Sequence, residues 1–228
     1  MTKVTYLGHS GFLIETGEHT VVIDPFLSGN PLATHSADDL KPTFILVTHG
    51  HGDHLGDALQ LAKDNGATII APFELAQFCE ARGATVHPMH IGGAYEFPFG
   101  RVKLTLALHG SAVIDDEGIT YTGNPVGFLV KFPDLTLYHA GDTGLFGDMK
   151  LIGYTSAIDL ALLPIGDNFT MGPDDALIAA GMLHPKLVVP MHFNTFDVIQ
   201  QDPDDFVSRL AQTGIAGLVM APGDVYSS

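Results

Sequence analysis

Short apolar runs alternate with polar turns along the first third of the chain. The runs are rich in β-branched and aromatic residues and end at turn residues, which is typical of strands. Strands are expected at 3–7, 11–16 and 20–25, with residues 16–19 as a hairpin connection between the last two. A polar segment rich in Gly, Pro and Ser, residues 26–43, predicts a loop. The apolar run at 44–47 then predicts a short buried strand.

Helical spacing begins after residue 54 and alternates with further strands. Leu55, Leu59 and Ala62 share one helical face in 55–66, and Gly66 is suited to end that helix. Pro173 and two acids suit the start of a later helix. The predicted helices are 55–66, 73–83, 172–184 and 202–214. The predicted strands are 67–72, 84–89, 94–99, 101–110, 126–132, 135–142, 157–165, 186–192 and 215–222, with a loop at 110–126.

The second half of the chain repeats the order of elements in the first half. No linker with a change in composition divides the two halves. Two similar sheets packed together, with helices outside, would bury the apolar face of each element. We therefore expect an α/β protein in one domain, residues 1–228.

Composition narrows the functions that need consideration. The 228 residues include 10 basic and 26 acidic side chains, giving a net charge of −16, and the basic residues are scattered. This disfavours a nucleic-acid partner, because phosphate binding needs clustered Lys and Arg. The N-terminal residues lack the pattern of a signal peptide, and no apolar run could span a bilayer. We expect a cytoplasmic protein without membrane contact, and homo-oligomerisation stays open.

Metal chemistry would have to use histidine and carboxylate ligands. The chain has a single cysteine, Cys79, in an apolar periodic stretch where a buried structural thiol is expected. By contrast, several predicted strands end at a residue that commonly binds metals. These residues are His49, His109, Asp142 and His192. Loops at the strand ends of a layered α/β fold converge on one edge, which predicts that these side chains meet.

The sequence THGHGDH, residues 48–54, crowds three histidines and an aspartate into a short turn. Gly50 and Gly52 would let the backbone fold tightly enough for these neighbours to reach one centre. Imidazole and carboxylate ligands suit zinc, manganese or iron. Any one histidine is more often structural than ligating. The combination of a local cluster with partners at strand ends favours a metal site over a chance match.

These motifs resemble those of the metallo-β-lactamase superfamily. The resemblance is greatest to a family of metal-dependent hydrolases related to the ascorbate-phosphate lactonases, and it covers essentially the whole chain. The segments that carry it are THGHGDH (48–54), His109, HAGDTG (139–144) and MH (191–192), together with LGHSGFLIE, VVIDPF, PMHIGGAYEF, GNPVGFLV, LLPIGDNFTMGPDDA and VVPMHF.

The resemblance implies a four-layer αββα sandwich with a dinuclear metal site at one edge of the sheets. One metal would take His49, His51 and His109, and the second would take Asp53, His54 and His192, with Asp142 bridging the two. The two divalent ions would be zinc or manganese, with iron or nickel as further candidates. A hydroxide held between them would attack the substrate. Asp142 stands where the β-lactamases with a cysteine ligand have a thiolate, which disfavours antibiotic hydrolysis.

Other polar residues near the motifs have either a structural or a functional interpretation. Asp24, which ends a predicted strand, is expected to accept a hydrogen bond from the outer nitrogen of a metal-bound histidine. Asp53 is a candidate for proton transfer, and His9 is a candidate catalytic group or a structural histidine. A structural role is favoured for His90 and His139. Weak substrate-binding candidates are Asn124, Asn168 and Asn194, whereas His19, His35, His87 and His184 receive no role, and Asp202, Asp204 and Asp205 are expected to begin the last helix.

The resemblance implies a hydrolase of a small ester-type substrate, with a phosphodiester or a lactone favoured. The absence of basic residues beside the ligand motifs weakly disfavours substrates with several phosphates. Loops 26–42 and 110–126 are the expected determinants of substrate choice. A non-catalytic metal-binding or sensor domain is the alternative, but such a domain would be expected to have lost ligands. A redox enzyme would need an electron-carrying flavin domain, for which the chain has no room.

Overall fold

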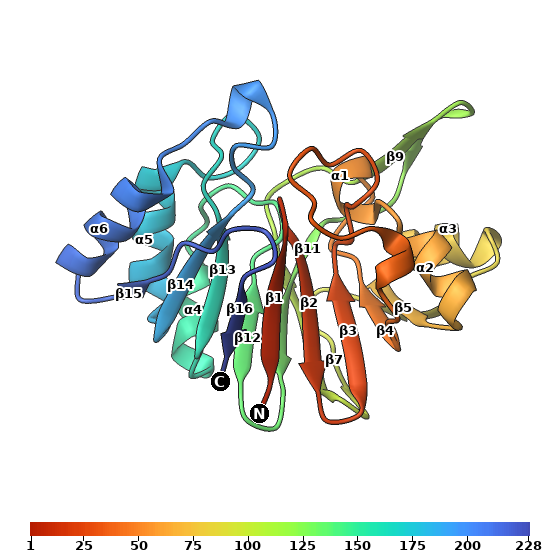
Figure 1. Ribbon diagram of the computed structural model, residues 1–228, viewed down its shortest axis with the longest axis horizontal. Coiled ribbons are helices and arrows are strands. Elements are labelled where there is room, and N and C mark those ends of the chain that lie inside the picture. The colour runs from red at the N-terminus through yellow and green to blue at the C-terminus, as the bar shows by residue number, and fades with distance from the viewer.

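The computed structural model describes residues 1–228 and contains two seven-stranded mixed sheets that face each other (Figure 1). In the first sheet the strand order is β16-β1-β2-β3-β4-β5-β6. Its strands are β1 (Lys3–Gly8), β2 (Gly11–Thr16), β3 (His19–Ile23), β4 (Phe44–Leu46), β5 (Thr68–Pro72), β6 (Thr85–Met89) and β16 (Val225–Ser227). Pairing is antiparallel among β16, β1, β2 and β3 and parallel from β3 to β6.

The second sheet has the order β15-β14-β13-β12-β11-β8-β7. Its strands are β7 (Ala94–Phe97), β8 (Gly100–Leu106), β11 (Val126–Lys131), β12 (Thr136–His139), β13 (Leu160–Pro164), β14 (Leu187–Met191) and β15 (Ala216–Gly217). Pairing is antiparallel among β7, β8, β11 and β12 and parallel from β12 to β15. The two sheets therefore share one plan, as the sequence predicted.

Helices cover the outer face of each sheet and complete four layers. The helices are α1 (Gly52–Leu55), α2 (Ala58–Asn65), α3 (Phe73–Ala81), α4 (Met149–Thr155), α5 (Pro173–Leu183) and α6 (Pro203–Gln212), with 3₁₀ turns at Ala37–Asp39 and Asp197–Ile199. One apolar cluster, which includes Phe12 and Phe128, fills the space between the sheets. Two further clusters lie between the first sheet and α2–α3 and between the second sheet and α4–α6. The predicted αββα sandwich is confirmed, and none of the helices has the length and apolar character that crossing a membrane requires.

Two local predictions were wrong, and two elements were not predicted. The predicted loop 110–126 contains a hairpin, β9 (Ala112–Asp115) and β10 (Gly118–Tyr121), which projects from the body of the protein (Figure 1). Helix α4 was not predicted, and the strand expected at 215–222 is only the two-residue β15. The chain then crosses to the first sheet, where the unpredicted β16 pairs with β1.

The sheet topology brings several strand ends to one edge. Strand β1 is antiparallel to β2, and β2 to β3, so β1, β3 and β4 run in the same direction. By the same reasoning β8, β12, β13 and β14 share a direction. The loops that follow β1, β3, β4, β8, β12 and β14 meet at the edge of the sandwich opposite the chain termini (Figure 1).

Candidate metal centre

The candidate ligands lie in the loops at this shared edge. His192 directly follows β14, whereas His109 and Asp142 lie a few residues beyond β8 and β12. The motif after β4 is not a simple turn, because Asp53 and His54 lie in the short helix α1. Gly50 is required by close packing: a Cβ there would lie 2.4 Å from Thr122 Oγ1 at the base of the hairpin. Gly52 has no such neighbour.

Three imidazole rings form the first group of candidate ligands. The Nδ1 atom of His51 lies 3.0 Å from Nε2 of His49 and 3.2 Å from Nε2 of His109. Thr48 fixes the orientation of His49: its hydroxyl donates to Asp24 at 2.7 Å and lies 2.9 Å from His49 Nδ1. A hydroxyl that donates to Asp24 must accept from His49 Nδ1–H, which leaves a lone pair on His49 Nε2 directed at the other two rings.

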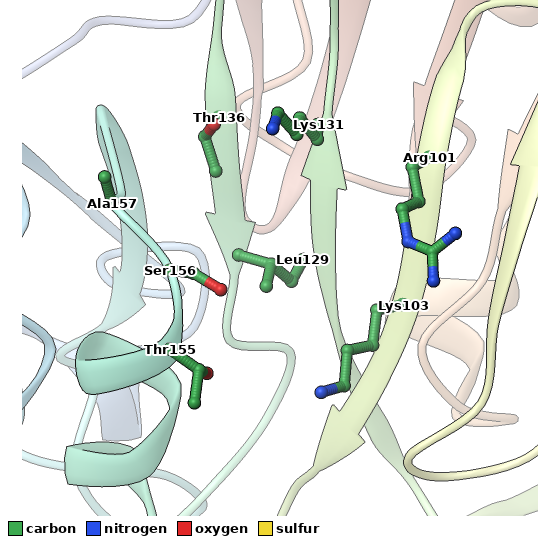
Figure 2. Close-up of a pocket in the computed structure, with 8 residues that line it drawn as sticks. All are labelled: Arg101, Lys103, Leu129, Lys131, Thr136, Thr155, Ser156 and Ala157. Atoms are coloured by element: carbon green, nitrogen blue, oxygen red, sulfur yellow. The ribbon is translucent and has the colours of Figure 1, made fainter.

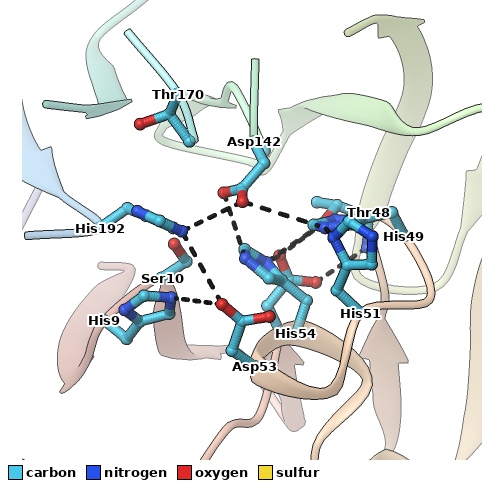
Figure 3. A network of polar contacts seen from close by, with 12 residues as sticks. His9, Ser10, Thr48, His49, His51, Asp53, His54, Asp142, Thr170 and His192 are labelled. Carbon is cyan, nitrogen blue, oxygen red and sulfur yellow. Dashed lines mark hydrogen bonds and ion pairs between the residues drawn. The ribbon is translucent and has the colours of Figure 1, made fainter. Parts of the chain in front are cut away.

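The second group surrounds Asp142, which is buried at the centre of the network (Figure 3). Its Oδ1 lies 3.1 Å from His54 Nε2, and its Oδ2 lies 3.1 Å from His192 Nε2. Oδ2 also lies 3.5 Å from His109 Nε2 and 4.0 Å from His49 Nε2. Asp142 therefore contacts rings of both groups, the position that a bridging carboxylate requires.

A test of whether these residues fit a cation comes from Asp24 and His54. Asp24 is fully buried, and its Oδ2 lies 2.7 Å from His54 Nδ1. With the ring proton on Nδ1, His54 Nε2 presents a lone pair to Asp142 Oδ1, and both atoms are buried without a hydrogen-bond partner. Two facing lone pairs repel each other unless a positive charge lies between them. The donor set of imidazole and carboxylate groups fits a divalent transition metal.

The pKa shifts indicate the same demand for positive charge. Burial by itself would lower the pKa of His54, but Asp142 and Asp24 raise it well above its ordinary value. Burial would raise the pKa of Asp142, yet His192 and His54 hold it well below the usual range. His49 behaves differently, because burial and the charge of His54 both lower its pKa strongly. A proton could satisfy His54 alone, whereas a metal ion would also satisfy Nε2 of His49, a ring that resists a second proton.

His9 lies closer to the ligands than the sequence alone indicated. It is fully buried, and its Nδ1 lies 2.8 Å from Thr195 Oγ1. Its Nε2 lies 3.1 Å from Asp53 Oδ2 (Figure 3). Burial lowers its pKa to about 4, against the hydrogen bond with Asp53. Ligand atoms of His9, Asp53, His54 and His192 all lie within 4.8 Å of one another. His9 is thus placed either to bind a cation or to hold Asp53.

Other polar candidates from the sequence lie outside these groups. His139 Nε2 donates to the Ser10 carbonyl at 2.9 Å, and its Nδ1 accepts from the Gly141 amide at 3.1 Å, so both ring nitrogens have partners. His90 is exposed and stacks on Phe73. The candidate substrate-binding asparagines, Asn124, Asn168 and Asn194, are not among the residues that line the cleft beside the candidate ligands. Asp202 accepts from the amides of Asp204 and Asp205, which confirms the predicted acidic start of the last helix.

A cleft of about 410 Å³ opens beside the two groups. His51, His109, Asp53, Asp142 and His192 form its floor, and Phe169, Phe196 and Val198 form an apolar wall. No Lys or Arg lines it. Cys79 is buried in the core beneath the first sheet, away from this site, as predicted.

Sequence reasoning did not identify Thr48, Thr195 or the apolar wall. The sequence could have indicated a role for Thr48, because Thr48 directly precedes His49 and a hydroxyl at that position can reach the His49 ring. Thr195 contacts His9 across 186 positions of sequence. No local pattern indicates such a contact. The wall residues lie in loops, where an apolar side chain carries no periodic signal.

Comparison with known proteins agrees with this geometry. A family profile described as "Beta-lactamase superfamily domain" matches residues 3–192. A UPF0173 metal-dependent hydrolase from Bacillus thuringiensis is 57% identical over 224 residues, covering 97% of this chain and 98% of the relative. One from Desulforamulus reducens is 56% identical with the same coverage. The structure of Igni18, a metallo hydrolase from Ignicoccus hospitalis, has a TM-score of 0.91 at 36% identity and covers 100% of both chains.

Proposed function

Since this chain belongs to the metallo-β-lactamase superfamily and is a metal-dependent hydrolase, we propose that it uses two divalent cations to hydrolyse a small ester-type substrate. The observation that carries the proposal is the position of Asp142, within 3.1 Å of His54 and His192 and within 4.0 Å of His49. A single buried carboxylate that contacts two groups of imidazoles is what a pair of adjacent cations requires.

Each cation would have its own set of side chains. His49, His51 and His109 would hold one, and Asp53, His54 and His192 would hold the other, with Asp142 between them. The cations would be zinc or manganese, with iron or nickel as further candidates. When bound, they would lower the pKa of an attacking water and neutralise the charge that develops on the substrate oxygen.

Asp53 is the carboxylate placed for proton transfer. Its side chain is 26% exposed toward the cleft, whereas those of Asp142 and Asp24 are 3% and 0% exposed. Asp53 can therefore accept the proton that an attacking water loses. His9 Nε2, 3.1 Å away, would donate to Asp53 and keep its carboxylate directed into the cleft. Thr195 would hold His9 in that orientation from the other side of the ring.

The cleft favours a substrate with an apolar group beside the scissile bond. Phe169, Phe196 and Val198 are 52%, 38% and 61% exposed, so the wall presents aromatic and aliphatic surface. A substrate with several phosphates would need a Lys or Arg to bind them, and the cleft has neither. A lactone or a singly charged phosphodiester fits these walls. Phe26 of loop 26–42 lies 6.4 Å from Phe196, ring to ring, so this loop would contribute to substrate choice.

The test combines metal analysis with a hydrolysis screen. Purified protein is expected to hold two divalent ions per chain and to cleave one class among chromogenic phosphodiesters, lactones and thioesters. His51→Ala and Asp142→Ala should each abolish hydrolysis and lower metal content while the circular dichroism spectrum stays native. His90→Ala, which removes an exposed histidine outside both groups, is the matched control. Full activity in His51→Ala or Asp142→Ala would refute the proposed site.

A further inference from the structure

A second cleft lies on the outer face of the second sheet, away from the candidate metal centre. It has a volume of about 350 Å³ and lies between β8, β11 and the end of α4 (Figure 2). Arg101, Lys103 and Lys131 line it together with Leu129 and hydroxyls of α4 and β12, and no acidic residue does. The residues that supply those hydroxyls are Thr136, Thr155 and Ser156.

The strand register places the three cations on one face. Arg101 is directly opposite Lys131 across the β8–β11 pair, and Lys103 is opposite Leu129. The alternate residues Val102 and Val130 point into the core between the sheets. The basic side chains therefore point outward together. Like charges directly opposite each other destabilise an antiparallel strand pair. An anion bound between Arg101 and Lys131 would reduce this repulsion.

This concentration of positive charge is unusual in so acidic a chain. Three of the 10 basic residues line one cleft of a protein that carries 26 acidic residues. Of the seven basic residues outside the cleft, three have acidic partners, in the pairs Lys186–Asp159, Arg82–Asp115 and Arg209–Asp174. In the cleft, Arg101 pairs with Glu96, but no carboxylate lies within 4.0 Å of the ammonium group of Lys103 or Lys131.

An apolar groove continues from the basic cleft along the same sheet face. It has a volume of about 360 Å³ and shares Lys103, Leu129 and Thr155 with the cleft. Its other walls are largely apolar, and Asp148 is its only acidic residue. The apolar side chains include Leu106, Phe146, Leu151 and Ile152. A ligand that fills both parts must therefore have an anionic end and an aliphatic end.

We propose that this cleft and groove bind an amphipathic small-molecule anion. Its phosphate or carboxylate head group lies between Lys103 and Lys131, within reach of the hydroxyls of Thr136 and Ser156. Its aliphatic chain lies over Leu129 and extends along α4 toward Leu151. None of the residues that line the cleft or the groove lines the candidate metal centre. The site is therefore separate from the proposed hydrolytic one.

Isothermal titration calorimetry on the full chain tests this assignment. The probes are decyl phosphate, decanoate and decanol, each below its aggregation concentration, and inorganic phosphate. At least one decyl anion should bind at one site per chain, and at least tenfold more tightly than decanol or inorganic phosphate. Comparison of decyl phosphate with decanoate identifies the preferred head group. Failure of both decyl anions to bind overturns the proposal.

Charge reversal locates the binding site. Lys103→Glu with Lys131→Glu should weaken the bound decyl anion at least tenfold, because it replaces two attractive charges with repulsive ones. The matched control is Lys41→Glu with Lys63→Glu, which changes net charge equally at two exposed lysines outside this sheet. Equal affinity in wild type and the first double variant, or equal loss in the control, would place the ligand elsewhere and overturn the proposal.

A substitution in the apolar groove along α4 tests the proposal without changing the lysines. Leu151 is 58% exposed on α4, so Leu151→Asp should leave the fold intact. This change should weaken binding of the decyl anion at least tenfold through loss of chain contact and charge repulsion. Unchanged affinity in Leu151→Asp would show that the groove does not hold the chain, and the amphipathic assignment would be wrong.

Discussion

Asp24→Asn is expected to weaken metal binding although Asp24 would not itself contact a metal. Asp24 Oδ2 accepts from Thr48 Oγ1 at 2.7 Å and lies 2.7 Å from His54 Nδ1. With Oδ1 still accepting from the Thr48 amide at 2.8 Å, an asparagine would place its NH₂ group where Oδ2 stands. That NH₂ group donates, so His54 Nδ1 must accept and the ring proton must move to Nε2, where the metal would bind.

The size of the effect follows from the number of contacts that change. Loss of a partner that orients a metal-binding histidine typically weakens metal affinity about 10–100-fold, or about 1.4–2.8 kcal/mol. Asp24 also orients His49 through the Thr48 hydroxyl. Asp24→Asn should therefore weaken both metal sites. Thr48→Val, which removes only the hydroxyl, should weaken mainly the site with His49, His51 and His109.

Metal titration against a chromophoric chelator measures the two affinities separately. Asp57→Asn is the matched control, because Asp57 is another buried carboxylate that accepts from the backbone amides of Leu27 and Ser28 and contacts no histidine of the site. It should leave both affinities within about twofold of wild type. If Asp24→Asn is folded and binds two metals as tightly as wild type, the argument from hydrogen-bond direction fails.

Three further predictions concern stability and reactivity. Chelation should lower the melting temperature, since a metal at 100 times its Kd stabilises the folded state by about 2.7 kcal/mol, and an unchanged melting curve after verified metal removal would contradict this. Burial raises the pKa of the Cys79 thiol to about 12, so a thiol reagent at pH 8 should label it only after unfolding in guanidinium; rapid labelling of native protein would refute its burial. Phe128→Ala should lower the free energy of unfolding by about 3–5 kcal/mol in a denaturant titration, because Phe128 is fully buried between the sheets, and a loss below about 1 kcal/mol would contradict that packing.

The sequence predicted most strands because each has a buried face whose apolar residues recur with a fixed period. It failed at α4, where a different constraint acts. Gly153 reads as a helix breaker, yet it lies in α4 against the end of α5, and a Cβ there would be 2.5 Å from the carbonyl oxygens of Met182 and Leu183. This glycine permits close contact between two helices. Such a contact between distant segments is invisible to local propensity.

The hairpin β9–β10 was missed for a related reason. Ile114 and Ile119 are cross-strand partners and are 71% and 76% exposed, so neither strand has a buried face that would impose alternation. The candidate ligands at 48–54 were the opposite case. They are neighbours in sequence, in the loop after β4 and in the short helix α1. The strand-end argument also predicted that His109, Asp142 and His192 would meet this segment, whereas a contact between loops with no such signal, His9 with Thr195, was missed.

Three residues at the shared edge of the sheets have an unfavourable backbone conformation. His9, Asp24 and His192 have φ angles of 58°, 45° and 54°, in the left-handed region that non-glycine residues avoid. Such residues cost on the order of 1–3 kcal/mol each and persist only where neighbouring contacts fix them. One such contact joins the two sheets, because the His192 amide donates to the His9 carbonyl at 2.7 Å. Within the first sheet, the Tyr6 hydroxyl donates to the same carbonyl at 2.9 Å. Glycine would relieve the strain at any of these positions but would remove the side chain that contacts Asp53 (from His9), His54 (from Asp24) or Asp142 (from His192). The packed sheets therefore stabilise a ligand geometry that their loops would not adopt alone.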